Sequence, residues 1–254
     1  MKIAHFLKSY YRTLIIIGVA VLLFEGVTDL TRWLEPVLFP GLTKIVPALF
    51  GSTPKLFKGL LSSFGLLLPA YGLAFVLGVS LGLTVGWYEP LRKALVPIFR
   101  GLAPVPPTLL IPYAIAVLPT FWLSSAFIIL VGSFWPILIS TIHGVVLLED
   151  RYLDNARSLG LTGFKLLRKV IFPATLPMIF TGAGMALVFS FMLLTVAEMF
   201  GAKSGLGHFI QYYADFSDYP RVLAGMIFMA LCIILVMELF DFIQRKVLYW
   251  AAKR

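Results

Sequence analysis

The stretch Gly101–Leu148, GLAPVPPTLLIPYAIAVLPTFWLSSAFIILVGSFWPILISTIHGVVLL, decides the fold class, because its 48 residues include no Asp, Glu, Lys or Arg. One helix that crosses a lipid bilayer needs about 20 mostly apolar residues, so this stretch is long enough for two. Proline interrupts a helix, and Leu118-Pro119-Thr120 therefore divides the stretch into predicted spans near 103–118 and 122–145. The segment predicts an integral membrane protein.

The composition of the whole chain agrees with this prediction. Of its 254 residues, 60% are hydrophobic and 13% are charged, whereas soluble domains have about 45–50% apolar and about 25% charged residues. Too few charged side chains remain to cover a surface exposed to water. The single cysteine, Cys232, excludes a scaffold held by disulfides within the chain.

Four further apolar segments raise the predicted number of spans to six. The first of them is the weakest, and the basic residues before it would also suit a signal peptide. No small-residue cleavage site follows it, which favours an uncleaved span. The four segments are Thr13–Phe24 continued by Gly26 and Val27, Gly59–Trp87, Val170–Ala197 with its helix beginning around Pro177, and Val222–Met237 extended to Ile243. We therefore expect an all-α membrane protein with one domain over residues 1–254.

The distribution of lysine and arginine predicts the orientation. Fifteen of the 21 lie in the N-terminus and in residues 88–101, 146–172 and 244–254, which share one side of a six-span chain. The positive-inside rule places that side, and both termini, in the cytoplasm. The net charge of +9 thus indicates topology, with no need for a nucleic-acid partner. On the opposite side, the four prolines of residues 31–58 predict irregular chain or a short surface helix.

The longest charged segment on the predicted cytoplasmic side is LEDRYLDNARSLG, residues 148–160. As a helix, it would place Tyr152, Ala156 and Leu159 on one face, with Leu153 beside them. Gly160 is positioned to end this helix in a left-handed turn. The interpretation of the segment stays open at this point: a helical elbow can dock onto a partner, or an amphipathic helix can lie on lipid headgroups.

A second helix is expected directly after this turn. Thr162 can act as its N-cap, and apolar side chains continue it to Ile171. Pro173 is expected to stop it, because the residue before a proline disfavours the helical conformation.

The spacing within this segment resembles the EAA loop of binding-protein-dependent ABC importer permeases. The family pattern is Glu-Ala-Ala, three residues, Gly, nine residues, an aliphatic residue, one residue, and Leu-Pro. The matching positions here are Asp154-Asn155-Ala156, Gly160, Val170 and Phe172-Pro173. Asp154 is a shorter acid than the usual one, Asn155 replaces a small apolar residue, and Phe172 replaces leucine.

Other motifs are similar to the nitrate, sulfonate and taurine branch of that family, over about residues 55–250. They occur in the family's order before and after the loop. They are Phe134-Trp135-Pro136-Ile137-Leu138, Leu176-Pro177, Ala197-Glu198-Met199 and Gly205-Leu206-Gly207.

The resemblance implies a type I importer permease in a bacterial cytoplasmic (inner) membrane. Two copies would form the translocation path for a small solute, such as the anions nitrate, sulfonate or taurine. A cytoplasmic ATPase dimer would supply energy, and an extracytoplasmic binding protein would deliver the solute. The loop 148–173 would contain the coupling helix that contacts the ATPase, through Asp154, Asn155, Ala156, Arg157, Leu159 and Gly160.

The chain itself is expected to be no enzyme and to hold no cofactor. It has no Gly-x-x-x-x-Gly-Lys-Ser/Thr motif, so ATP would bind the partner subunits. No catalytic group is predicted. No metal site is predicted either, because Cys232 and the histidines have no companions at ligand spacing.

Two further features within the predicted spans are candidates for specific roles. Gly78, Gly82 and Gly86 repeat every four residues, a spacing that lets helix backbones pack closely. Glu198 lies at the outer end of the fifth predicted span. Because carboxylates are costly in a membrane, we predict that it belongs to an outer gate.

Two alternatives remain at this stage. An ion-coupled secondary transporter would use carboxylates near the middle of the membrane and often has duplicated halves; neither is evident in the sequence. A non-transport assembly protein would leave the elbow motif unexplained.

Overall fold

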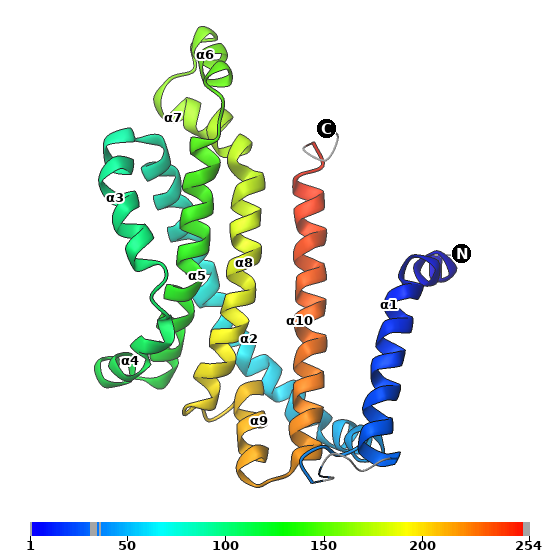
Figure 1. The fold of residues 1–254 in the computed structure, drawn as a ribbon. Helices are drawn as coiled ribbons and strands as arrows, with labels where there is room; N and C mark the ends of the chain where they lie inside the picture. The colour runs from blue at the N-terminus through cyan, green and yellow to red at the C-terminus, as the bar shows by residue number, and fades with distance from the viewer. Residues whose placement is uncertain (1, 31–34, 36, 251–254) are drawn as a thin grey trace. The chain divides into compact units, whose positions relative to one another are not determined.

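The computed structural model describes residues 2–30, 35 and 37–250 (Figure 1). Within these residues the chain is helical and has no strand, which confirms the all-α prediction. The elements in chain order are α1 (Lys2–Glu25), the π-helical turn η1 (Gly26–Leu30), α2 (Leu42–Trp87), α3 (Glu89–Leu102), the 3₁₀ turn η2 (Pro107–Leu110), α4 (Ile111–Val117), α5 (Phe121–Val146), α6 (Asp150–Ser158), α7 (Gly163–Leu166), the π-helical turn η3 (Leu167–Ile171), α8 (Phe172–Met199), α9 (Leu206–Asp215) and α10 (Tyr219–Val247).

The residues pack as two compact units. The smaller unit comprises residues 1–57 and 209–229, and the larger one comprises residues 58–208 and 230–254. Helices α2, α9 and α10 each have residues in both units.

Four helices of the described chain are long and apolar enough to cross a membrane: α2, α5, the continuous helix Gly163–Met199, and α10. The shorter apolar helix Ile15–Thr28 corresponds to the first predicted span. A further candidate arises only if α3 is counted together with Pro107–Val117, and this pair is bent by 81°. The described residues therefore do not confirm the predicted number of six spans.

The predicted span 103–118 is not a single helix. The segment consists of the turn η2 and the seven-residue helix α4. Pro104, Pro106 and Pro107 lack the N–H groups that a continuous helix would require there.

The predicted break at Leu118-Pro119-Thr120 is confirmed. Leu118 has an extended backbone after α4, and α5 begins at Phe121. Thr120 is the N-cap of α5, and its Oγ1 accepts a hydrogen bond of 3.2 Å from the N–H of Leu123. A threonine in this position satisfies one of the donors that every helix start leaves free.

The prediction that residues 31–58 are irregular or form a short surface helix is wrong for its later part. Residues 42–58 are the beginning of α2, which continues without interruption for 46 residues. Pro47 and Pro54 lie within this helix and remove single hydrogen bonds without ending it. Pro36 lies outside the described residues.

The predicted stop at Pro173 and the predicted helix start near Pro177 are also wrong. Helix α8 follows directly on η3, and Pro177 lies inside it. In the π-helical turn, the N–H of Phe172 donates to the carbonyl of Leu167, five residues earlier. Such a wider turn re-forms the hydrogen bonding next to a proline, so the helix continues.

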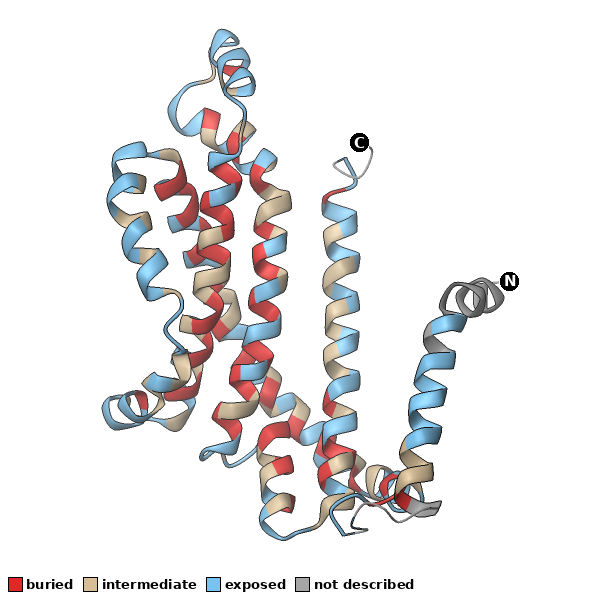
Figure 2. Ribbon diagram, in the orientation of Figure 1, coloured by how far each residue is buried: buried red, intermediate tan, exposed pale blue. Residues whose placement is uncertain are grey.

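Helices α5 and α8 form the centre of the larger unit (Figure 2). Small residues allow their close approach: a Cβ atom on Gly182 would lie 2.7 Å from the carbonyl oxygen of Pro136, and one on Gly144 would lie 2.7 Å from Cβ of Met178. Membrane helices pack through such small residues because lipid supplies no hydrophobic driving force between them. Fully buried side chains on the two helices include Ile128, Ile129, Ile137, Leu138, Ile179 and Leu194.

The smaller unit is held by contacts between distant segments. The Glu25 carboxylate accepts a hydrogen bond of 3.0 Å from the N–H of Leu42. The rings of Phe57 and Phe228 meet edge to face with centroids 5.4 Å apart. Such a pair adds about 0.5–1.5 kcal/mol to the burial of the rings themselves.

Candidate functional site

The segment after α5 forms the helical elbow that the sequence predicted, with α6 and α7 at one end of the larger unit (Figure 1). Gly160 has a φ of +78°, in the left-handed region. Its N–H donates to the carbonyl of Arg157 at 2.9 Å, and the N–H of Leu161 donates to the carbonyl of Ala156 at 3.1 Å. These two bonds define a Schellman motif, which satisfies the last carbonyl groups of α6.

The apolar residues of the elbow point in two directions, whereas the sequence placed them on one stripe. Ala156 is buried, and Leu153 and Leu161 pack with it against the core of the larger unit. Tyr152 and Leu159 are exposed, Leu159 to 81%. The elbow is thus fixed from one side and presents apolar side chains on the other.

Further exposed apolar residues lie close in sequence to those of the elbow. Phe164 is 74% exposed and Leu147 is 70% exposed. Together with Tyr152 and Leu159 they form a set that we call the elbow patch. The elbow therefore exposes both these apolar side chains and the charged residues of α6.

The charged residues of α6 form local ion pairs. Asp154 and Arg157 are 3.0 Å apart, and both are exposed. Arg151 pairs with Glu149, and the hydrogen bond and charge of that carboxylate raise the pKa of the Arg151 guanidinium. Thr162 occupies the N-cap position of α7, but its side chain makes no capping hydrogen bond. Thr162 thus has the backbone conformation of the predicted N-cap but not its side-chain hydrogen bond.

Of the six residues predicted to contact a partner, five are exposed: Asp154, Asn155, Arg157, Leu159 and Gly160. Ala156 is buried beneath them. A small residue at this position lets α6 lie against the core, so its role lies in supporting the helix.

Glu198 lies at the opposite end of α8 and is only 2% exposed. Its Oε1 accepts a hydrogen bond of 2.6 Å from Oγ of Ser63, and its Oε2 accepts one of 2.7 Å from the N–H of Gly207. Oγ of Ser63 in turn accepts a hydrogen bond of 3.0 Å from the N–H of Leu206. The carboxylate and the serine thus cap the first turn of α9, where free N–H groups and the helix dipole favour a negative charge.

The glycines that follow Glu198 make room for its carboxylate. Gly205 has a φ of +134°, and a Cβ atom there would lie 2.3 Å from Cδ of Glu198. A Cβ atom on Gly207 would lie 2.9 Å from Cβ of Glu198. The two motifs Ala197-Glu198-Met199 and Gly205-Leu206-Gly207 therefore form one packed unit. Its third component, Ser63, did not emerge from the sequence, because it lies 135 residues before Glu198.

The glycines at every fourth position of α2 lie against α5. Cβ atoms built on them would lie within 2.6–2.8 Å of side-chain atoms of the facing residues. The facing pairs are Gly78 with Ile137, Gly82 with Thr141, and Gly86 with Val145.

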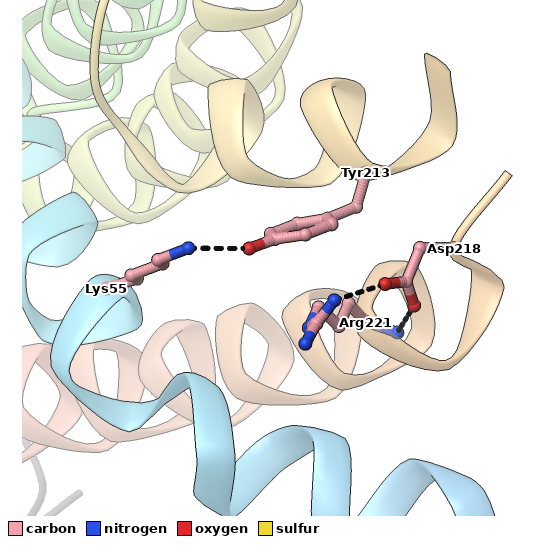
Figure 3. Close-up of polar contacts among 4 residues, drawn as sticks. All are labelled: Lys55, Tyr213, Asp218 and Arg221. Atoms are coloured by element: carbon pink, nitrogen blue, oxygen red, sulfur yellow. Dashed lines mark hydrogen bonds and ion pairs between the residues drawn. The ribbon is translucent and has the colours of Figure 1, made fainter. Parts of the chain in front are cut away.

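A second polar cluster, in the smaller unit, was not expected from the sequence (Figure 3). The Lys55 ammonium group donates a hydrogen bond of 2.9 Å to the hydroxyl oxygen of Tyr213. The Arg221 guanidinium lies 5.0 Å from the centroid of the same ring and pairs with Asp218. Lys55 comes from α2, whereas Tyr213, Asp218 and Arg221 come from α9, the turn after it and the start of α10, so the cluster joins α2 to a segment that is distant in sequence.

Residues 74–249 match the family model described as "Binding-protein-dependent transport system inner membrane component". The chain is similar to the nitrate import permease protein NrtB of Leptolyngbya laminosa, with 32% identity over 78% of this chain and 71% of that protein. It is also similar to the bicarbonate transport system permease protein CmpB of Synechocystis sp., with 36% identity over 63% of this chain and 58% of that protein.

The fold is similar to a solved structure as well. A chain of the inward-facing MetNI methionine ABC transporter aligns with a TM-score of 0.64 and 19% identity, over 78% of this chain and 98% of that chain. This likeness concerns the fold. It agrees with the long apolar helices of the larger unit.

Proposed function

The chain belongs to the family of binding-protein-dependent transport system inner membrane components and is the permease subunit of an ABC importer, and we propose that it carries a small oxyanion of the nitrate or bicarbonate class. The proposal is supported by the two relatives whose names give these anions as their substrates.

The elbow is proposed as the contact with a cytoplasmic ATPase dimer that supplies the energy. The observation that carries this proposal is the elbow's geometry: α6 is fixed to the core through Ala156 and Leu161, and the elbow patch faces outward. A partner that covers Leu159 and Phe164 would bury two large apolar side chains, each worth about 1.5–3 kcal/mol. ATP hydrolysis would take place on the partner alone.

The remaining assembly is proposed from family membership. A second copy of the chain would complete the translocation path, and an extracytoplasmic binding protein would deliver the anion. The elbow would then face the cytoplasm of a bacterial inner membrane, with Glu198 near the outer face as part of an outer gate. Both termini would be cytoplasmic, in agreement with the distribution of lysine and arginine.

Uptake in cells tests this function. The chain is produced together with an ATPase and a binding protein of the same transporter family, in a strain that cannot import nitrate or bicarbonate. We expect uptake of one of these anions that requires the ATPase and continues when the proton gradient is collapsed while ATP is maintained. Uptake that follows the proton gradient and is independent of the ATPase would refute the proposal in favour of a secondary transporter.

A further inference from the structure

A cavity of about 250 Å³ with both polar and apolar walls lies next to Glu198, at the end of α5 and α8 that is opposite to the elbow. Its walls are residues of α2, the first turn of α5, the last turn of α8 and the connection from α8 to α9. All of these residues belong to the larger unit. One ordered water needs only about 15 Å³ of such space, so the cavity has room for a small molecule.

One buried hydroxyl in the wall of the cavity, that of Ser125, has no hydrogen-bond partner among the described residues. The serine is only 2% exposed. Buried polar groups are nearly always paired, and an unpaired one calls for an explanation. Ser125 lines the cavity, so a molecule in the cavity can supply the missing partner once the hydroxyl turns toward it.

The cavity also holds a positive charge that no carboxylate neutralises directly. Lys203 lines it and forms no ion pair with any carboxylate in the described part of the chain. The hydroxyl oxygens of Ser62 and Ser204 are 2.7 Å apart and share one hydrogen bond. One of the two hydroxyls donates this bond, and the proton of the other hydroxyl remains available for a ligand.

The carboxylate of Glu198, which also lines the cavity, already has hydrogen-bond partners on both of its oxygens. The donors are the hydroxyl of Ser63 and the N–H of Gly207. Its charge is directed at the start of α9, where free N–H groups balance it. The wall therefore offers the unpaired hydroxyl of Ser125, the second hydroxyl proton of the Ser62–Ser204 pair and the cation of Lys203, a set that fits a ligand rich in acceptor oxygens.

We propose that this cavity is a binding site for a small oxyanion, held by the Lys203 ammonium group and the hydroxyls of Ser125 and of the Ser62–Ser204 pair. Trp122 forms an apolar part of the wall. The choice of nitrate as a probe rests on the proposed function, whereas the site itself rests on the donors described above.

Protection of a cysteine against a neutral reagent tests the site. The full chain, with Cys232→Ser, is reconstituted in lipid, and the reporter Ala202→Cys is placed in the cavity wall. The rate of its reaction with N-ethylmaleimide is measured in nitrate and in chloride of equal ionic strength. At a nitrate concentration about ten times the dissociation constant, a covered thiol reacts about tenfold more slowly. Phe216→Cys, which is exposed in the other unit, is the matched control and should react equally in both salts.

Two substitutions relate the protection to the proposed donors. Lys203→Gln in the reporter background should weaken the affinity for nitrate about tenfold or more, as expected for loss of a charged hydrogen bond. Lys203 is exposed, so this variant retains the fold. Ser125→Ala should weaken it by a smaller factor. Equal rates in nitrate and chloride for Ala202→Cys, or equal protection of Phe216→Cys, overturn the proposal.

The outcome is separate from that of the uptake experiment, because protection needs no ATPase, binding protein or transport. Uptake of nitrate without protection overturns the cavity site and leaves the proposed function. Protection without uptake supports the site and overturns nitrate as the transported anion.

Discussion

Ser63 and Glu198, which are 135 residues apart in the sequence, share a hydrogen bond of 2.6 Å between the serine hydroxyl and one carboxylate oxygen. The bond links the middle of α2 to the last turn of α8. The other carboxylate oxygen and the serine oxygen both accept from backbone N–H groups at the start of α9. The buried carboxylate of Glu198 therefore has a structural role, because it joins α2, α8 and α9, in addition to any role in a gate.

Replacing Glu198 with alanine should destabilise the protein. The substitution leaves the Ser63 hydroxyl and the Gly207 N–H buried without their acceptor, at a cost of about 1–3 kcal/mol for each group. Glu198→Gln retains one acceptor oxygen and should be clearly milder. Thermal unfolding of the purified chain in detergent measures both. Equal stability of the alanine variant and the wild type would show that the capping bonds contribute nothing.

Replacing Gly160 with valine should uncouple transport without removing the chain from the membrane. The left-handed φ is strongly disfavoured for a β-branched residue, at a cost of about 1–3 kcal/mol, while no atom lies within 4 Å of the added Cβ. Gly160→Asn is the matched control, because asparagine tolerates this conformation. We expect loss of ATPase co-purification and of anion uptake for valine, with both largely retained for asparagine. Wild-type behaviour of the valine variant would contradict a coupling role of the elbow.

Replacing Gly82 with alanine should disturb the packing of α2 on α5. The new Cβ would lie 2.6 Å from Cβ of Thr141 and 3.1 Å from a backbone oxygen, so the helices must separate. Overpacking of this kind costs about 1–3 kcal/mol. Gly72 belongs to the same helix and has open space around it, which makes Gly72→Ala a control that should be neutral. The measurement is the melting temperature of each variant: Gly82→Ala should melt at a lower temperature than the wild type, and Gly72→Ala at the same temperature. Equal melting temperatures of the two variants would contradict the prediction.

The orientation of the chain can be tested with cysteines at exposed lysines. In a Cys232→Ser background, Lys203→Cys should react with a membrane-impermeant thiol reagent in intact cells, because it lies on the predicted outer side. Lys93→Cys should react only after the membrane is opened. Labelling of Lys93→Cys in intact cells would reverse or refute the predicted topology.

Local signals in the sequence were sufficient for several features. Pro119 and Thr120 marked the boundary between α4 and α5, and a glycine at the right spacing marked the left-handed end of α6. Both depend on the chemistry of single residues, so neighbours in the sequence contain the information.

Other features depend on contacts that no local pattern reveals. Residues 42–58 have the lysines and prolines of a loop, yet they continue into a long apolar helix, and packing of Leu56 in the smaller unit outweighs their weak helix propensity. Nothing in the sequence distinguishes Ser63 from other serines in apolar helices; its role follows only from the fold, which places it beside Glu198. The cavity at Ser125 and Lys203 likewise exists only because three segments that are distant in sequence meet.

The helix from Gly163 to Met199 links the two ends of the larger unit mechanically. Its 37 residues extend over about 55 Å at 1.5 Å per residue. If it tilts about the elbow, its far end, and with it Glu198, would shift by about 1 Å for each degree of tilt. The hydrogen bonds around that carboxylate span only 2.6–3.0 Å. A rotation of a few degrees on one side of the membrane would thus be enough to break them on the other.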